Sequence, residues 1–257
     1  MKRLVLLSLF VLSMATTAHA QVDCNALSPN AQYVGEHWFG TAEPLPLQGY
    51  QLVIDGVTRR FPTTALTFRI VDNPLIQGGT YSAGAKTGIR NSARMWVYLM
   101  NNDTCGNNIT LTEVPATDNT ALITFLKTTS GQQSMLHNGQ YEVVTAPINM
   151  AGSPIIASDL FTYQTAAIIS NPTKSGSDSQ FLMIHELGHV FTAFWHTQTS
   201  GGQLHGVLGK TLSESGCQYY TQYTPEQNAQ NPCWEPAPGF WEFMRWQYRH
   251  AAGTVIP

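Results

Sequence analysis

The sequence predicts an α+β protein in which strands and one helix come first and helices dominate afterwards. Three observations support this fold class. Short stretches rich in β-forming residues lie before residue 171, mostly helical patterns follow from about residue 180, and an HELGH motif at 185–189 stands at the junction. We therefore expect an N-terminal α/β subdomain over about residues 50–200 and a mainly helical C-terminal subdomain over about residues 201–257.

The start of the chain has the pattern of a signal peptide. Lys2 and Arg3 precede an apolar run over residues 4–14, and the sequence AHA at residues 18–20 provides a small-residue cleavage site. The apolar run is too short to cross a bilayer, which takes roughly 20 residues. We expect cleavage after this site (signal peptide 1–20) and a single secreted domain over residues 21–257, either extracellular or periplasmic.

The composition restricts the classes of partner. Charged residues make up only 11% of the 257-residue chain and the formal net charge is −3, whereas typical soluble domains have about 25% charged residues. There is no basic stripe, which argues against nucleic acid as a partner. No later apolar stretch is long enough to predict a transmembrane helix.

The cysteines predict disulfides. The chain has four, an even number that in an exported protein indicates two bridges. Three pairings are possible, and we favour Cys24–Cys105 with Cys217–Cys233 because the second pair closes a short local loop. No CxxC spacing is present, which argues against a zinc–cysteine site.

The N-terminal part contains strands around one long helix. Residues 66–71, LTFRIV, alternate and are rich in β-forming residues, so they predict a strand that stops at Asn73-Pro74. Residues 83–100 place apolar side chains on one helical face. Further strands are expected at 109–114, 121–126, 141–147 and 166–170.

The C-terminal part is predicted to be mainly helical. One helix is expected from about residue 180 to residue 196, with its first strong stop signal at Gly201-Gly202. Two more helices are expected at about residues 209–223 and 239–251.

The stretch HELGHVFTAFWH, residues 185–196, carries the strongest functional signal. On a helix, His185 and His189 stand one turn apart on one face, so both imidazoles can reach the same metal ion. Glu186 lies beside them and is placed to act as a general base toward a zinc-activated water. Residues 181–184 are apolar, so this helix is expected to be buried, where polar side chains need partners. The spacing therefore predicts a catalytic metal site.

In these residues the sequence resembles the zincin metallopeptidases, whose motif HExxH stands here as His185, Glu186, Leu187, Gly188 and His189. The resemblance implies a zinc-dependent peptidase, here an endopeptidase acting on protein or peptide substrates. It also implies a zincin-like fold: a mixed β-sheet with a backing helix and an active-site helix, followed by a mainly helical subdomain. The specific resemblance covers about 30 residues around the motif.

Three residues remain candidates for the third zinc ligand that a catalytic site requires. Glu214 lies in LSESGCQYY, which resembles the LxEGxAxY segment of gluzincin-type zincins. His196 resembles the third histidine of the metzincin motif HExxHxxGxxH, but it comes one residue late, and Thr192 replaces the helix-breaking glycine. On an unbroken helix His196 lies about 10 Å along the axis from His189. We favour Glu214, with His196 as the alternative and His205 as a further candidate.

Two other functions fit the same residues. One is an extracellular binding or adhesion module with a structural or vestigial zinc site, which closed coordination by four protein groups would favour. The other is a zincin-like hydrolase that acts on cell-wall peptides. Activity on casein against activity on peptidoglycan fragments separates the two kinds of hydrolase.

Overall fold

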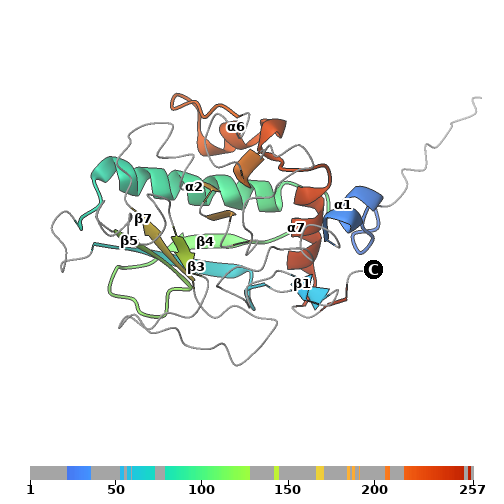
Figure 1. Ribbon diagram of the computed structural model, residues 1–257, viewed down its shortest axis with the longest axis horizontal. Helices are drawn as coiled ribbons and strands as arrows, with labels where there is room; N and C mark the ends of the chain where they lie inside the picture. The colour runs from blue at the N-terminus through green and yellow to red at the C-terminus, as the bar shows by residue number, and fades with distance from the viewer. Residues whose placement is uncertain are drawn as a thin grey trace, which may run out of the picture.

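A mixed β-sheet with helices beside it makes up the described structure (Figure 1). The computed structural model describes residues 22–35, 53–54, 57–58, 60–72, 79–127, 142–144, 166–170, 184–185, 187–188, 191, 206–208, 217–251 and 254–255. Within these residues, five strands form one sheet in the order β4-β3-β5-β7-β6. The strands are β3 (Ala65–Val71), β4 (Thr110–Glu113), β5 (Ile123–Lys127), β6 (Glu142–Val144) and β7 (Ala166–Ser170).

The sheet is parallel except at one edge. Strand β3 pairs in parallel with β4 and β5, β5 pairs in parallel with β7, and β6 runs antiparallel to β7. Parallel neighbours need crossover connections, and helix α2 (Ala83–Asn101) lies between β3 and β4 in the chain. The sequence predicts an α+β protein with a mixed sheet, and the described residues do combine helices with a mixed sheet, although that sheet is mostly parallel. Each of the five strands overlaps a stretch that the sequence predicts to be a strand.

The register of the central strands explains their apolar pattern. Leu66, Phe68 and Ile70 alternate along β3 and are all buried. Phe68 pairs with Ile123 of β5, and Ile70 pairs with Phe125. The rings of Phe68 and Phe125 meet edge to face with centroids 5.8 Å apart. Alternate residues of a strand point to the same face of the sheet, so these three apolar side chains of β3 share one buried face.

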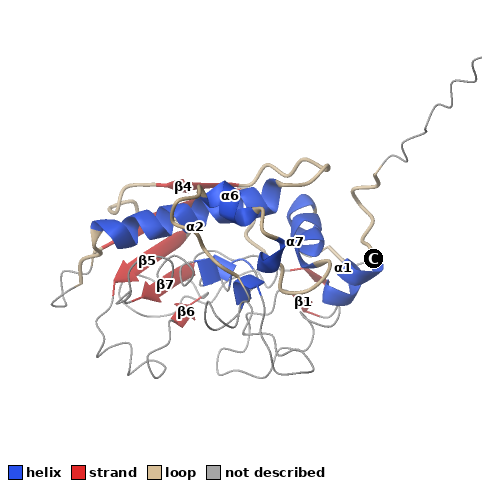
Figure 2. Cartoon of the chain, turned by 90° about the horizontal axis from the view of Figure 1, so that it is seen from above, coloured by secondary structure: helices blue, strands red, loops and turns tan. Residues whose placement is uncertain are grey.

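Helix α2 extends over one face of the sheet (Figures 1 and 2). It begins after Ser82, whose side chain accepts a hydrogen bond from the backbone N–H of Ala85 at 3.1 Å. Its buried face includes Ile89, Trp96 and Met100, as the sequence periodicity predicts. The helix predicted over 83–100 is thus confirmed to within one residue.

The start of the described chain is tied to its C-terminal helix. Helix α1 (Pro29–Tyr33) contacts α7 (Phe240–Arg249), the helix predicted at 239–251. The backbone N–H and hydroxyl of Ser28 both donate to Glu242 at 2.6 Å. The disulfide Cys24–Cys105, which the sequence analysis favours, joins this segment to the loop after α2.

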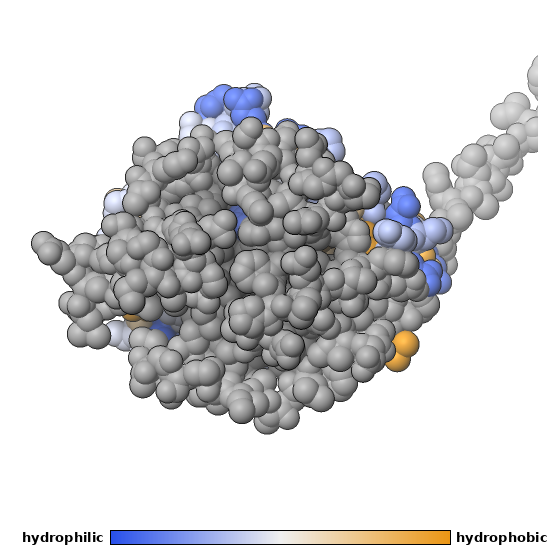
Figure 3. Space-filling view, viewed as in Figure 1, coloured by the Kyte–Doolittle hydropathy of each residue, from blue (hydrophilic) through white to orange (hydrophobic). Residues whose placement is uncertain are grey.

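Short elements complete the described structure. They are β1 (Val53–Ile54), β2 (Val57–Thr58), the 3₁₀ helices η2 (Gly206–Leu208) and η3 (Pro232–Trp234), and α6 (Pro225–Ala229). Helix α6 contacts α2, and the described side chains above it are hydrophilic in the space-filling view (Figure 3). The second favoured disulfide, Cys217–Cys233, is also present. Of the helices in the described part of the chain, none is long and apolar enough to cross a membrane.

The predicted helix over residues 209–223 is wrong in its C-terminal half. Residues 217–220 have no regular secondary structure, and a turn and bend follow at 221–223. The physical reason is that the backbone N–H and carbonyl of this stretch form hydrogen bonds with a distant side chain instead of bonds within a helix. Tyr220 donates its N–H to the side chain of Asn228 at 2.8 Å, and its carbonyl accepts from the same side chain at 2.9 Å. The predicted signal peptide, residues 1–20, lies outside the described residues.

Candidate functional site

The described residues of the HELGH segment are helical and buried. Ile184, His185, Leu187 and Gly188 are helical, as is Phe191, and each is buried. Helix formation here follows from an apolar sequence that contains no proline. The helical state expected for the motif is therefore found at every described position of it.

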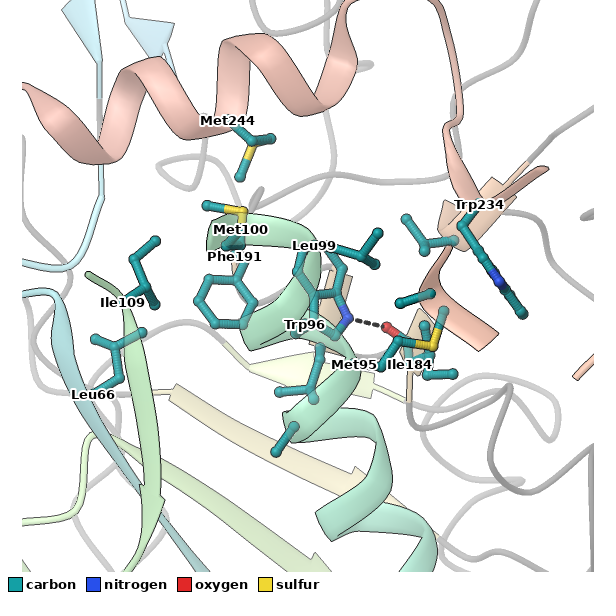
Figure 4. Close-up of a cluster of buried hydrophobic side chains, with 14 of the residues drawn as sticks. Leu66, Met95, Trp96, Leu99, Met100, Ile109, Ile184, Phe191, Trp234 and Met244 are labelled. Carbon is teal, nitrogen blue, oxygen red and sulfur yellow. Dashed lines mark hydrogen bonds between the residues drawn. The ribbon is translucent and has the colours of Figure 1, made fainter. Parts of the chain in front are cut away.

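Helix α2 holds this segment from one side (Figure 4). The indole Nε1–H of Trp96 donates to the backbone carbonyl of Ile184 at 2.9 Å, and both residues are fully buried. The Trp96 ring also stacks on Phe191, with centroids 5.0 Å apart and planes 20° apart. Trp96 thus contacts the segment at two positions that are two helical turns apart.

Helix α7 adds packing behind Trp96. The ring of Trp241 meets Trp96 edge to face at 5.2 Å, and the ring of Tyr248 lies 6.1 Å from that of Phe191. Burial raises the pKa of Tyr248, and the nearby Arg60 guanidinium opposes this only in part. Tyr248 is therefore neutral at physiological pH, so its role toward this segment is packing.

His185 is buried, and one of its ring nitrogens contacts a backbone carbonyl. Its side chain is only 3% exposed, and its Nδ1 lies 3.0 Å from the backbone carbonyl oxygen of Val207. A carbonyl oxygen only accepts, so Nδ1 carries the proton of this hydrogen bond. In the neutral ring the lone pair is then on Nε2. A backbone carbonyl bound to one ring nitrogen is the usual way in which proteins orient a histidine that binds metal through the other.

The donor chemistry of His185 therefore fits zinc. The other predicted site residues, Glu186, His189 and Glu214, lie outside the described residues, as do the alternatives His196 and His205. Within the described part of the chain, no group of three or more His, Cys, Asp or Glu side chains is arranged to hold a metal ion. Of the residues predicted to form the zinc site, the structure thus describes only His185, and Glu214 and His196 both remain candidates for the third ligand.

The Val207 carbonyl is a site group that the sequence does not reveal. Val207 is fully buried in η2, and it acts through its main chain, so its side chain carries no signal of the role. The one local hint is the glycine before it. Gly206 has a φ of +60°, in the region that side chains disfavour.

No protein-family model matches the chain, and no curated protein matches it significantly.

Proposed function

We propose that this protein is a secreted zinc-dependent metallopeptidase that hydrolyses peptide bonds. The observation that carries the proposal is His185, a buried histidine in an HExxH sequence whose Nδ1 is bound to a backbone carbonyl. A buried imidazole needs partners for its ring nitrogens, and the Val207 carbonyl is the partner of Nδ1. The mixed sheet, with α2 against the motif segment, supports the zincin-like fold as part of this proposal.

Each residue of the proposed site would have a separate role in hydrolysis. Zinc, when bound, lowers the pKa of an attacking water to about 7 and polarises the substrate carbonyl. His185 and His189 would hold the ion, with Glu214 or His196 as the third ligand. Glu186 would accept the proton of the attacking water and pass it to the leaving nitrogen. Val207 would keep His185 in the tautomer that binds through Nε2.

The disulfides support the secreted location. Cys24–Cys105 and Cys217–Cys233 both form in the structure, and such bridges persist in oxidising compartments. No described cysteine is free.

The proposal is tested by comparing the wild type with Glu186→Gln. Both are assayed for zinc content and for hydrolysis of casein and of peptidoglycan fragments. We expect both proteins to hold about one zinc per chain, and the variant to lose most activity, because the amide cannot accept a proton. A variant that keeps full activity contradicts the role of Glu186. A wild type that holds zinc but cleaves neither substrate favours the binding-module alternative, and cleavage of the fragments alone assigns a cell-wall substrate.

A further inference from the structure

A main-chain contact supports the carbonyl that binds His185. A Cβ added to Gly206 would lie 2.6 Å from the carbonyl oxygen of Trp234, 2.8 Å from the carbonyl carbon of Glu235 and 2.7 Å from the nitrogen of Pro236. All three are backbone atoms, which cannot swing away as a flexible side chain does. The segments 206–208 and 234–236 therefore meet backbone to backbone, and this contact requires glycine.

The 234–236 side of this contact is firmly held. The fully buried indole of Trp234 donates to the carbonyl of Asn228 at 2.8 Å. The Glu235 carboxylate accepts from the backbone N–H of Gly239 at 3.0 Å, just before α7. The disulfide from Cys233 to Cys217 anchors the segment from its N-terminal side. If a side chain were placed at Gly206, the backbones of 206–208 and 234–236 would have to separate.

Such a movement would act directly on His185. Val207 follows Gly206, and its carbonyl lies 3.0 Å from Nδ1 of His185. A separation beyond about 3.5 Å no longer makes a hydrogen bond, so a shift of about half an ångström is enough to break it. Without this acceptor, the Nδ1–H tautomer loses the hydrogen bond that favours it.

We propose that the contact between Gly206 and residues 234–236, tethered by Cys217–Cys233, is a positioning device that sets the tautomer and orientation of His185 for metal binding. The inference rests on the proposed zinc site. Gly206 touches neither metal nor substrate in this scheme, and it acts only through the Val207 carbonyl. The device thus links the metal affinity of the site to a disulfide-anchored turn in the C-terminal part of the chain.

The direct test is Gly206→Ala, with Gly106→Ala as a matched control. Gly106 also has a positive φ, +72°, but an added Cβ there meets nothing within 4 Å. Both variants place alanine at a positive φ, and only Gly206→Ala adds the collision. Zinc affinity is measured by competition with a chelator. We expect Gly206→Ala to lose about 10-fold to 100-fold and Gly106→Ala to match the wild type.

A second measurement tests whether the affinity change acts through the tautomer of His185. The ring ¹⁵N chemical shifts of His185 report its tautomer in the metal-free protein. We expect a single Nδ1–H tautomer in the wild type and in Gly106→Ala, and a mixture in Gly206→Ala. An affinity loss without a change of tautomer overturns the inference. Because His205 precedes Gly206, the affinity comparison is repeated in a His205→Asn background, where the loss must persist.

If Gly206→Ala does not fold, variants that lack one of the two disulfides test the same positioning role. Removal of Cys217–Cys233 by paired serines should lower zinc affinity about tenfold, and removal of Cys24–Cys105 should not. If the wild type binds zinc and both Gly206→Ala and the Cys217–Cys233 variant bind it equally well, the positioning role is wrong, while the proposed zinc site stands and the hydrolysis assay still decides the function. If the wild type binds no zinc, the proposed function fails and the inference fails with it.

Discussion

Trp96 couples α2 to the described residues of the motif segment, and Trp96→Phe measures that coupling. The change removes the hydrogen bond from Nε1 to the Ile184 carbonyl, worth about 1 kcal/mol net. Phenyl is smaller than indole by about 40 Å³, and the residual cavity costs about 1 kcal/mol. Lost apolar burial adds about 1 kcal/mol. We therefore expect the free energy of unfolding to fall by about 3 kcal/mol.

The matched control is Trp246→Phe. Trp246 is also buried, donates its Nε1–H to the carbonyl of Asn25 at 2.9 Å and stacks on Phe243, and neither of these partners belongs to the motif segment. Urea unfolding gives both stabilities, and hydrogen–deuterium exchange follows the peptide that contains Ile184. We expect similar stability losses in both variants, but faster exchange in that peptide only for Trp96→Phe. A loss below about 1 kcal/mol, or equal exchange in the two variants, refutes the reasoning.

Three further predictions concern stability. The hydrogen bonds from Arg90 hold the pKa of Glu113 below its ordinary value, so this pair stabilises the fold above the unfolded pKa of about 4.3, and its contribution is lost as the pH falls through the folded pKa. Glu113→Gln should therefore cost about 0.2–1 kcal/mol at neutral pH in urea unfolding, shrinking toward zero in acid, and a loss that grows in acid contradicts this. Asn228→Ala should cost about 2–3 kcal/mol in the same assay, because its side-chain amide accepts a hydrogen bond from the N–H of Tyr220 through Oδ1 and donates one to the carbonyl of Tyr220 through Nδ2, and a loss below about 0.5 kcal/mol contradicts that role. Removing metal with a chelator should lower the unfolding temperature, because zinc at 100 times its Kd stabilises by about 2.7 kcal/mol, and an unchanged temperature in calorimetry argues against a tightly bound ion.

Local patterns were sufficient where one physical effect dominated. Helix α2 was predictable because a long one-sided apolar stripe has few alternatives to burial against a sheet. The disulfide Cys217–Cys233 was predictable because its partners are close in sequence. The strands were predictable because β-forming runs end at turn residues.

Long-range contacts explain what the sequence did not predict. Residues 217–220 read as part of a helix, but Tyr220 pairs with the side chain of Asn228, eight residues later, and Cys217 is bound to Cys233. The helix propensity of a segment does not depend on partners that are distant in the sequence, and such tertiary contacts override it. The acceptor for His185 was hidden for a similar reason. It is a main-chain group of Val207, 22 positions along the chain, and any residue supplies a carbonyl.

The central claim is that His185 binds zinc, and the zinc content of purified protein tests it most directly. The comparison is between wild type, His185→Asn and His250→Asn, measured by plasma mass spectrometry without chelators. His250 is the matched control, because its Nδ1 also binds a backbone carbonyl, that of Trp246 at 2.8 Å, outside the motif. We predict about one zinc per chain in the wild type and in His250→Asn, and none in folded His185→Asn. Equal zinc in all three proteins, or none in the wild type, would contradict the account.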